Sequence, residues 1–221
     1  MIKGIIFDID GVLLDSMLIW NDLGARYLRS IGANPEDGLN EILFSMSMEQ
    51  GADYLKEHYK LEESTESILK GIQDMLEDFY FNEVEAKPGA DELMKYLKDN
   101  NIRMTAATSS PRTHVEKALT RNSLHQYIEV IYTTGEIGIS KHSPAIYDKA
   151  AEYMNLKPGE VLVFEDSLYA LKTAKDAGYQ TVGVYDKNGE TDQEGMKESS
   201  DIYVKNLSDV ISSVSRITQL L

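Results

Sequence analysis

The chain opens with Ile2-Lys3-Gly4-Ile5-Ile6-Phe7-Asp8-Ile9-Asp10-Gly11-Val12-Leu13-Leu14-Asp15-Ser16. The first part of this stretch, 2–8, is short and mostly apolar, as is typical of a buried strand in a parallel sheet. One strand cannot form a sheet alone, so this one must pair with strands that come later in the chain. Asp8 ends this stretch, and Asp10 and Gly11 come just after it, so the partner strands determine both the fold and the position of these residues.

Partner strands are predicted beyond the turn-forming run Lys87-Pro88-Gly89. Helices are expected at 90–99, 111–121, 144–154 and 168–177, and strands at 102–107, 128–132, 161–165, 180–185 and 201–204, before a last helix at 207–219. Such alternation predicts a parallel sheet covered by helices on both faces. Ser110-Pro111 and Ser143-Pro144 each indicate a helix start, with a capping serine before a proline at the first helical position.

The residues between the first strand and this series have a different pattern. Apolar residues recur at helical spacing over 64–81, with Ser64 or Thr65 as a possible N-cap, and no strand is predicted over 16–82. We therefore predict a Rossmann-like, three-layer α/β core formed by 1–15 and 84–221. An all-helical domain, 16–83, interrupts it, and the linkers near 14–17 and 82–88 are candidate hinges.

Composition narrows the class of protein. The formal net charge of −15 argues against a nucleic-acid or anionic-membrane partner, and an anionic ligand would need a local source of positive potential. No apolar run approaches the roughly 18 residues of a membrane span, and the N-terminus has no signal-peptide pattern. The absence of cysteine excludes disulfides and thiolate metal sites. We expect a cytoplasmic monomer.

Asp8 and Asp10 are the first candidate site residues, because ligands of open parallel sheets bind at the carboxyl ends of strands. Two neighbouring carboxylates repel each other unless a cation or a proton intervenes. A hard divalent cation such as Mg²⁺ suits an all-oxygen site of this kind. A lone Asp-x-Asp is equally typical of an ordinary turn at a strand end, so further residues are needed to decide.

Three other segments carry polar residues, two of them at predicted strand ends and one at a predicted helix start. Thr108-Ser109-Ser110 follows the strand at 102–107 and offers hydroxyls and free backbone N–H groups at a helix start, as a phosphate cradle would. Lys141 precedes another helix start and could supply fixed positive charge, although most lysines are solvated. Glu165-Asp166 ends the strand at 161–165 and places a second acidic pair beside the first.

These four segments, in this order, resemble the haloacid dehalogenase superfamily of aspartate-nucleophile phosphatases. Residues 8–16 are similar to its Asp-x-Asp-Gly-Val-x-x-Asp-Ser motif, and 163–178 are similar to its fourth motif. The resemblance covers essentially the whole chain. The helical insertion resembles the cap of the branch that contains β-phosphoglucomutase and small sugar-phosphate phosphatases.

The resemblance implies a role for each matching residue. Asp8 would attack phosphorus and become an aspartyl-phosphate, and Asp10 would be the general acid and then the general base. Mg²⁺ would be held by Asp8, the Asp10 backbone carbonyl and Asp166. Glu165 would hold these ligands in place without contacting the ion. The phosphate would be bound by Thr108, Ser109 and Lys141, and the substrate would be a small-molecule phosphate ester.

Departures from the family pattern bear on the reaction. His142 replaces the first proline of the usual Lys-Pro-x-Pro, and we expect a surface histidine there. The mutase branch has a histidine where this chain has Trp20, and a phosphate-gripping arginine where 45–49 has none. Hydrolysis is therefore favoured over a mutase. Trp20, Met46 and Met48 could line an apolar wall, although helix-core packing is their more usual role.

Other activities remain open. A β-phosphoglucomutase-type phosphotransferase is the nearest alternative. A phosphonate hydrolase would need a Schiff-base lysine, for which Lys56, Lys60 and Lys70 are candidates. A dehalogenase would leave Asp10 without a role. A non-catalytic binding module on the same fold would not need a nucleophile beside an acid.

Overall fold

The computed structural model describes residues 1–43 and 46–210 of the chain. The chain divides into two compact units, one formed by Met1–Ser16 with Val84–Leu221 and the other by Met17–Glu83. No helix among the described residues is long and apolar enough to cross a membrane. The first unit contains the sheet and is called the α/β unit below, and the second is called the helical unit.

The α/β unit is a six-stranded sheet in the order β3-β2-β1-β4-β5-β6, with every neighbouring pair parallel. The strands are β1 (Gly4–Phe7), β2 (Arg103–Thr108), β3 (Ile131–Thr133), β4 (Val161–Glu165), β5 (Gln180–Val184) and β6 (Ile202–Val204). All four residues of β1 are buried, because helices cover both faces of the sheet. The predicted parallel α/β core is confirmed.

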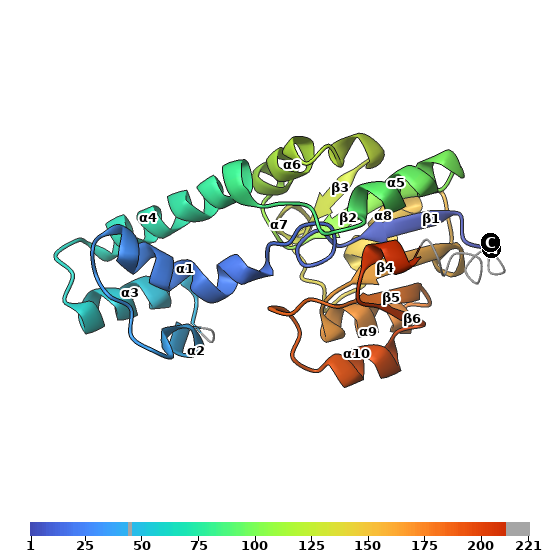
Figure 1. Cartoon of the computed structure of the whole chain (residues 1–221). Coiled ribbons are helices and arrows are strands. Elements are labelled where there is room, and N and C mark those ends of the chain that lie inside the picture. The colour runs from blue at the N-terminus through green and yellow to red at the C-terminus, as the bar shows by residue number, and fades with distance from the viewer. Residues whose placement is uncertain (44–45, 211–221) are drawn as a thin grey trace. The chain divides into compact units, whose positions relative to one another are not determined.

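Helices form the two outer layers of this unit (Figure 1). They are α5 (Ala90–Asp99), α6 (Arg112–Arg121), α7 (Thr134–Ile137), α8 (Ala145–Tyr153), α9 (Leu168–Asp176) and α10 (Gln193–Ser199). In Figure 1, α5 and α6 lie on one side of the sheet and α9 and α10 on the other. Helix α8 packs on β1, β2 and β3 through a buried apolar cluster that includes Ile6, Ile146 and Tyr147.

The order of the strands determines where the candidate site lies in the α/β unit. The chain runs from β1 outward to β2 and β3, and then crosses back to β4 on the other side of β1. Such a reversal opens a crevice at the carboxyl ends of the central strands. Phe7 of β1 is level with Ala106 of β2 and with Phe164 of β4. The residues that follow these three strands are therefore neighbours in space.

The helical unit contains α1 (Met17–Ser30), α2 (Leu39–Leu43), α3 (Met48–Tyr59), α4 (Thr65–Asp78) and a π-helical turn, Phe79–Glu83. Its described residues contain no strand. Ser64 caps α4 by accepting a hydrogen bond from the Ser67 backbone N–H, as predicted, and Ser47 forms a capping box with Gln50 at α3. Apolar side chains at helical spacing, among them Ile68, Ile72 and Leu76, form the buried face of α4.

Two predicted helix starts need correction. Pro111 and Pro144 are themselves the N-cap residues of α6 and α8, so each helix begins one residue later than predicted, and neither has a capping side chain. The short helices α7 and α10 were not predicted, because 134–137 and 193–199 carry little apolar periodicity. The Asp192 side chain, which accepts from the Gly195 backbone N–H, was the available signal for α10. Residues 207–210 of the predicted last helix are helical, and its remainder lies outside the described residues.

Candidate active site

Asp8 follows β1 directly and stays in the sheet for one more hydrogen bond, from its backbone N–H to the Phe164 carbonyl at 2.9 Å. The chain then turns back sharply, with Leu13 and Leu14 donating to the Ile9 carbonyl. Gly11 lies in this turn at φ 74°, a backbone conformation that glycine adopts without steric cost. The turn keeps Asp8 and Asp10 at the same end of the sheet.

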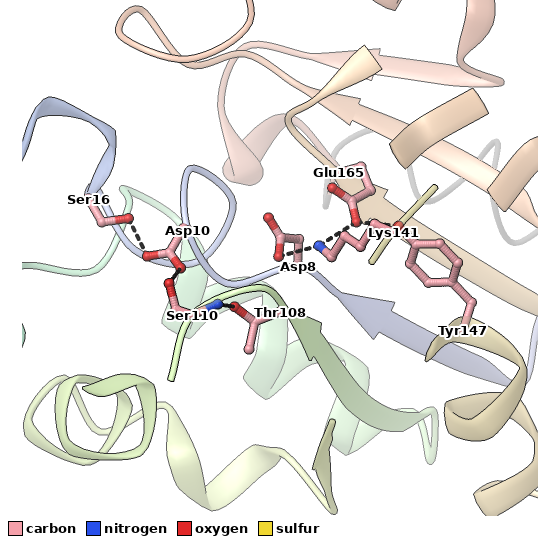
Figure 2. Close-up of polar contacts among 8 residues, drawn as sticks. All are labelled: Asp8, Asp10, Ser16, Thr108, Ser110, Lys141, Tyr147 and Glu165. Carbon is pink, nitrogen blue, oxygen red and sulfur yellow. Dashed lines mark hydrogen bonds and ion pairs between the residues drawn. The ribbon is translucent and has the colours of Figure 1, made fainter. Parts of the chain in front are cut away.

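Lys141 is the centre of the polar contacts drawn in Figure 2. Its Nζ lies 2.6 Å from Asp8 Oδ1 and 2.7 Å from Glu165 Oε1, and its side chain is only 3% exposed. Tyr147, on α8, donates its hydroxyl to the same Glu165 Oε1 at 2.7 Å. Lys141 is therefore a buried bridge between the ends of β1 and β4. It is not a solvated surface lysine, which was the other interpretation of the sequence.

Three carboxylates meet at this point. Asp8, Glu165 and Asp166 are all buried, and each offers an oxygen within 4.8 Å of the others. Glu165 Oε2 is buried without a hydrogen-bond partner among the described residues. A buried acceptor left without a partner is costly, and a cation would satisfy it. The donor set therefore fits a hard divalent ion such as Mg²⁺, and Glu165 is a candidate ligand itself, whereas the family resemblance implied only a supporting role for it.

The electrostatics support the same interpretation. Burial raises the pKa of Asp8 well above its ordinary value, Lys141 opposes this shift, and the charges of Glu165, Asp166 and Asp10 add to it. Burial, followed by the charge of Glu165, raises the pKa of Asp166 to about 8. Burial alone would lower the pKa of Lys141, but the charges of Asp8 and Glu165 outweigh burial and raise it. In the absence of a metal ion the crowded carboxylates therefore favour protonation of Asp8 and Asp166, and a bound cation would oppose it.

Asp10 is held by two hydroxyl groups (Figure 2). Ser16 donates to its Oδ1 at 2.7 Å, and Ser110 donates to its Oδ2 at 2.6 Å. Ser110 was expected to cap α6, but its hydroxyl binds this carboxylate instead. Serine hydroxyls can donate or accept, so both contacts can persist whether Asp10 is ionised or protonated.

The remaining predicted site residues lie at the end of β2 and beyond. Thr108 is buried, and its hydroxyl oxygen accepts from the Ser110 backbone N–H at 3.0 Å, while Ser109 is exposed beside it. His142 is exposed and packs against Tyr169, with ring centroids 4.4 Å apart and the ring planes tilted by 33°. Burial raises the pKa of Tyr169; the charge of Lys141 opposes this shift, and the charges of Glu165, Asp8 and Asp166 add to it.

The sequence assigned no site role to Ser16 or Tyr147, and it assigned Ser110 only to helix capping. Ser16 belongs to the first motif, and Ser110 directly follows two predicted site residues, so the sequence contained a local signal for both. Tyr147 lies six residues beyond Lys141 on a helix, and no local pattern indicates that its hydroxyl reaches the end of β4.

The helical unit has a cavity of its own of about 310 Å³. Its lining is Trp20, Leu23, Gly24, Asn40, Leu43, Met46, Ser47, Met48, Gly51, Leu55 and Ile72. The three residues expected to form an apolar wall, Trp20, Met46 and Met48, all contribute to it. None of these described lining residues is charged, and Asn40 and Ser47 are the polar ones among them.

Comparison with known proteins identifies the family. A family model described as haloacid dehalogenase-like hydrolase matches residues 5–184, most of the chain. The chain therefore belongs to the haloacid dehalogenase-like hydrolases.

Its relatives include enzymes named as phosphatases. The phosphorylated carbohydrates phosphatase of Thermotoga maritima is 27% identical over 81% of this chain and 83% of its own length. The probable pseudouridine-5'-phosphatase of Drosophila melanogaster is 29% identical over 82% of this chain and 80% of its own. The crystal structure of a putative β-phosphoglucomutase from Thermotoga maritima aligns with a TM-score of 0.86 at 26% identity, covering 96% of this chain and 100% of that one. The predicted class, a phosphoric monoester hydrolase of this family, is confirmed.

Proposed function

We propose that the protein is a Mg²⁺-dependent phosphatase that hydrolyses a small phosphorylated metabolite, such as a sugar phosphate, through an aspartyl-phosphate on Asp8. The observation that carries the proposal is the buried Lys141, which bridges Asp8 and Glu165 beside Asp166. A nucleophile beside a fixed cation and a set of carboxylate oxygens that fits a divalent ion is suited to phosphoryl transfer, in which positioning and charge stabilisation dominate.

In the first half of the reaction, an Asp8 carboxylate oxygen attacks phosphorus and the ester P–O bond breaks. Lys141 holds Asp8 Oδ1 and thereby orients the carboxylate for this attack. Asp10, held by Ser16 and Ser110, gives its proton to the leaving alkoxide oxygen. Mg²⁺, held by Asp8, Glu165, Asp166 and the Asp10 carbonyl, would neutralise negative charge shared by the phosphate and the nucleophile.

In the second half, Asp10 takes a proton from water as the water oxygen attacks phosphorus. The bond between phosphorus and Asp8 then breaks, and inorganic phosphate leaves. The Thr108 hydroxyl and the backbone at Ser109 lie at the end of β2, where they can bind phosphoryl oxygens. Asp10 therefore serves as acid and then as base, and its two serine partners keep it in place through both steps.

Hydrolysis is favoured over phosphoryl transfer to a sugar phosphate. We assign the selection of the organic part of the substrate to the helical unit, whose cavity is lined without any charged side chain. A mutase must also bind the second phosphate of a bisphosphate, which requires cationic partners. Ser45, part of the segment compared with the mutase arginine, lies outside the described residues.

The phosphonate hydrolase alternative is disfavoured by the cap lysines. Lys60 and Lys70 are exposed, and Lys70 is ion-paired with Asp74. A lysine that forms a Schiff base needs a lowered pKa, which burial in an apolar pocket or a neighbouring cation provides. Lys56 is half-buried near the end of α3, and it does not line the cavity described above.

The test is phosphate release from a panel of phosphorylated sugars, sugar alcohols, nucleotides and cofactors, with Mg²⁺ and with EDTA. Asp8→Asn should abolish release, whereas Asp176→Asn, the same change at an exposed site on α9, should leave it unchanged. Release that persists in EDTA or in Asp8→Asn would contradict the proposal. Activity only when a sugar bisphosphate is added would favour the mutase.

A further inference from the structure

Tyr147 is a polar residue in an apolar environment. It is fully buried and belongs to the cluster that joins α8 to the sheet, together with Ile6, Ile146 and Val163. A tyrosine used only to fill such a cluster would bury its hydroxyl at a cost, and phenylalanine would serve as well. The Tyr147 hydroxyl instead reaches out of the cluster to Glu165 Oε1, 2.7 Å away (Figure 2).

The two oxygens of Glu165 have different environments. Oε1 accepts from both Tyr147 and Lys141, at 2.7 Å each. Oε2 is buried without a hydrogen-bond partner among the described residues, and Glu165 belongs to the cluster with Asp8 and Asp166. Two donors on one oxygen fix the plane of a carboxylate and leave its other oxygen in a defined position.

We propose that Tyr147 is a positioning residue for the metal: by holding Glu165 Oε1, its hydroxyl dedicates Oε2 to the cation site. The proposal rests on the metal dependence of the proposed function and adds a residue to it. Tyr147 itself contacts neither the substrate nor the ion.

Lys141 cannot fulfil this role alone, because it is shared with the nucleophile. Its Nζ contacts Asp8 as well as Glu165, so its position must respond when Asp8 gains or loses a phosphoryl group. Tyr147 donates to Glu165 from the rigid apolar cluster. It therefore keeps Glu165 in place throughout the reaction.

The phenol is also suited to remain a donor. A phenol has an ordinary pKa of about 10, so at neutral pH the Tyr147 hydroxyl carries the proton that it donates to Glu165. A neutral donor fixes the carboxylate without adding a second positive charge that would compete with the metal ion.

The chain offers a control tyrosine in the same apolar cluster. Tyr179 packs against Tyr147, with ring centroids 6.1 Å apart, and donates its hydroxyl to Asp148 of α8 at 2.8 Å. Asp148 is not part of the three-carboxylate cluster. Tyr147→Phe and Tyr179→Phe therefore each remove one tyrosine-to-carboxylate hydrogen bond from one cluster, and only the first touches the proposed metal site.

The experiment is calorimetric titration of metal-free protein with Mg²⁺, together with melting curves in EDTA and in Mg²⁺. Removing a hydrogen bond to a metal ligand typically weakens metal binding about 10- to 100-fold. We expect Tyr147→Phe to raise the Mg²⁺ Kd by about tenfold or more and to reduce the rise in Tm that Mg²⁺ produces. Tyr179→Phe should retain the wild-type Kd. Tyr147→Met, which also keeps an apolar side chain at this position, should reproduce the effect and carries the test if the phenylalanine variant does not fold.

The outcomes separate this inference from the proposed function. Equal Mg²⁺ affinity in wild type, Tyr147→Phe and Tyr179→Phe would overturn the positioning role even if the enzyme is an active phosphatase. Equal losses in the two phenylalanine variants would also overturn it, because they would indicate a general effect of loosening the cluster. Weaker binding confined to the variants at 147 would support it, even if no phosphate ester in the panel were hydrolysed. A wild-type protein that binds no Mg²⁺ would overturn both.

Discussion

Replacing Lys141 by Met should destabilise the metal-free protein strongly. The ammonium makes ion pairs of 2.6 and 2.7 Å with two carboxylates, and all three side chains are at most 8% exposed. Removing one partner from a buried ion pair leaves uncompensated charge and typically costs about 3–5 kcal/mol. For a chain of this size, that corresponds to a fall in Tm of about 6–20 °C, measured by calorimetry in EDTA at neutral pH.

The control is Lys3→Met. Lys3 pairs with Glu160 at 2.6 Å, the same distance, but its side chain is 54% exposed, so its loss should cost about 0–1 kcal/mol. Mg²⁺ should restore part of the stability of Lys141→Met, because a divalent cation can replace the missing charge among the remaining carboxylates. If Lys141→Met melts no lower than Lys3→Met, the argument that burial gives this bridge its strength is refuted.

Three further predictions follow from the site and from the helical unit. The pKa of Asp166 is raised from 3.8 to about 8 in the metal-free protein, so its contribution to stability is present below pH 3.8 and is lost as the pH rises through about 8. Melting curves in EDTA should therefore fall over this window more steeply for wild type than for Asp166→Asn. Ser110→Ala removes one donor to the Asp10 carboxylate and should lower kcat roughly tenfold, in steady-state assays, with little change in KM. Gly51→Leu should fill the cavity of the helical unit, raise KM by roughly tenfold and change the emission of Trp20, whereas Gly51→Ala should do neither.

The positions of the site residues could be predicted because they depend on local patterns. An apolar run followed by polar residues indicates a strand end, and parallel strands bring such ends to one edge of the sheet. This reasoning places Asp8, Thr108 and Asp166 at the ends of β1, β2 and β4. It needs only the periodicity of the sequence and the order of its elements.

The contacts among these residues could not be predicted in the same way. Ser110 illustrates the difficulty: a serine before a proline is a strong local signal for a helix cap, yet its hydroxyl binds Asp10, 100 residues away in the chain. Tyr147 has no local signal, because its helical spacing predicts an apolar core position and says nothing about its hydroxyl. From the sequence alone, Lys141 was consistent with a solvated side chain as well as with a site residue. Only the assembled fold shows that it is buried. Each role depends on the conformation of a side chain within the assembled fold.

A strongly acidic chain should repel an anionic substrate. The charge of the site itself explains how the substrate can still bind. With their carboxylates ionised, Asp8, Glu165 and Asp166 carry three negative charges against the single positive charge of Lys141. Without a metal ion this crowding raises the pKa of Asp8 and of Asp166, so both carboxyls favour their protonated forms in a chain of net charge −15. A divalent cation would cancel the excess, after which Lys141 and the backbone N–H groups at the end of β2 can attract the phosphate. Metal binding should therefore precede substrate binding, and inorganic phosphate should bind measurably in Mg²⁺ but not in EDTA.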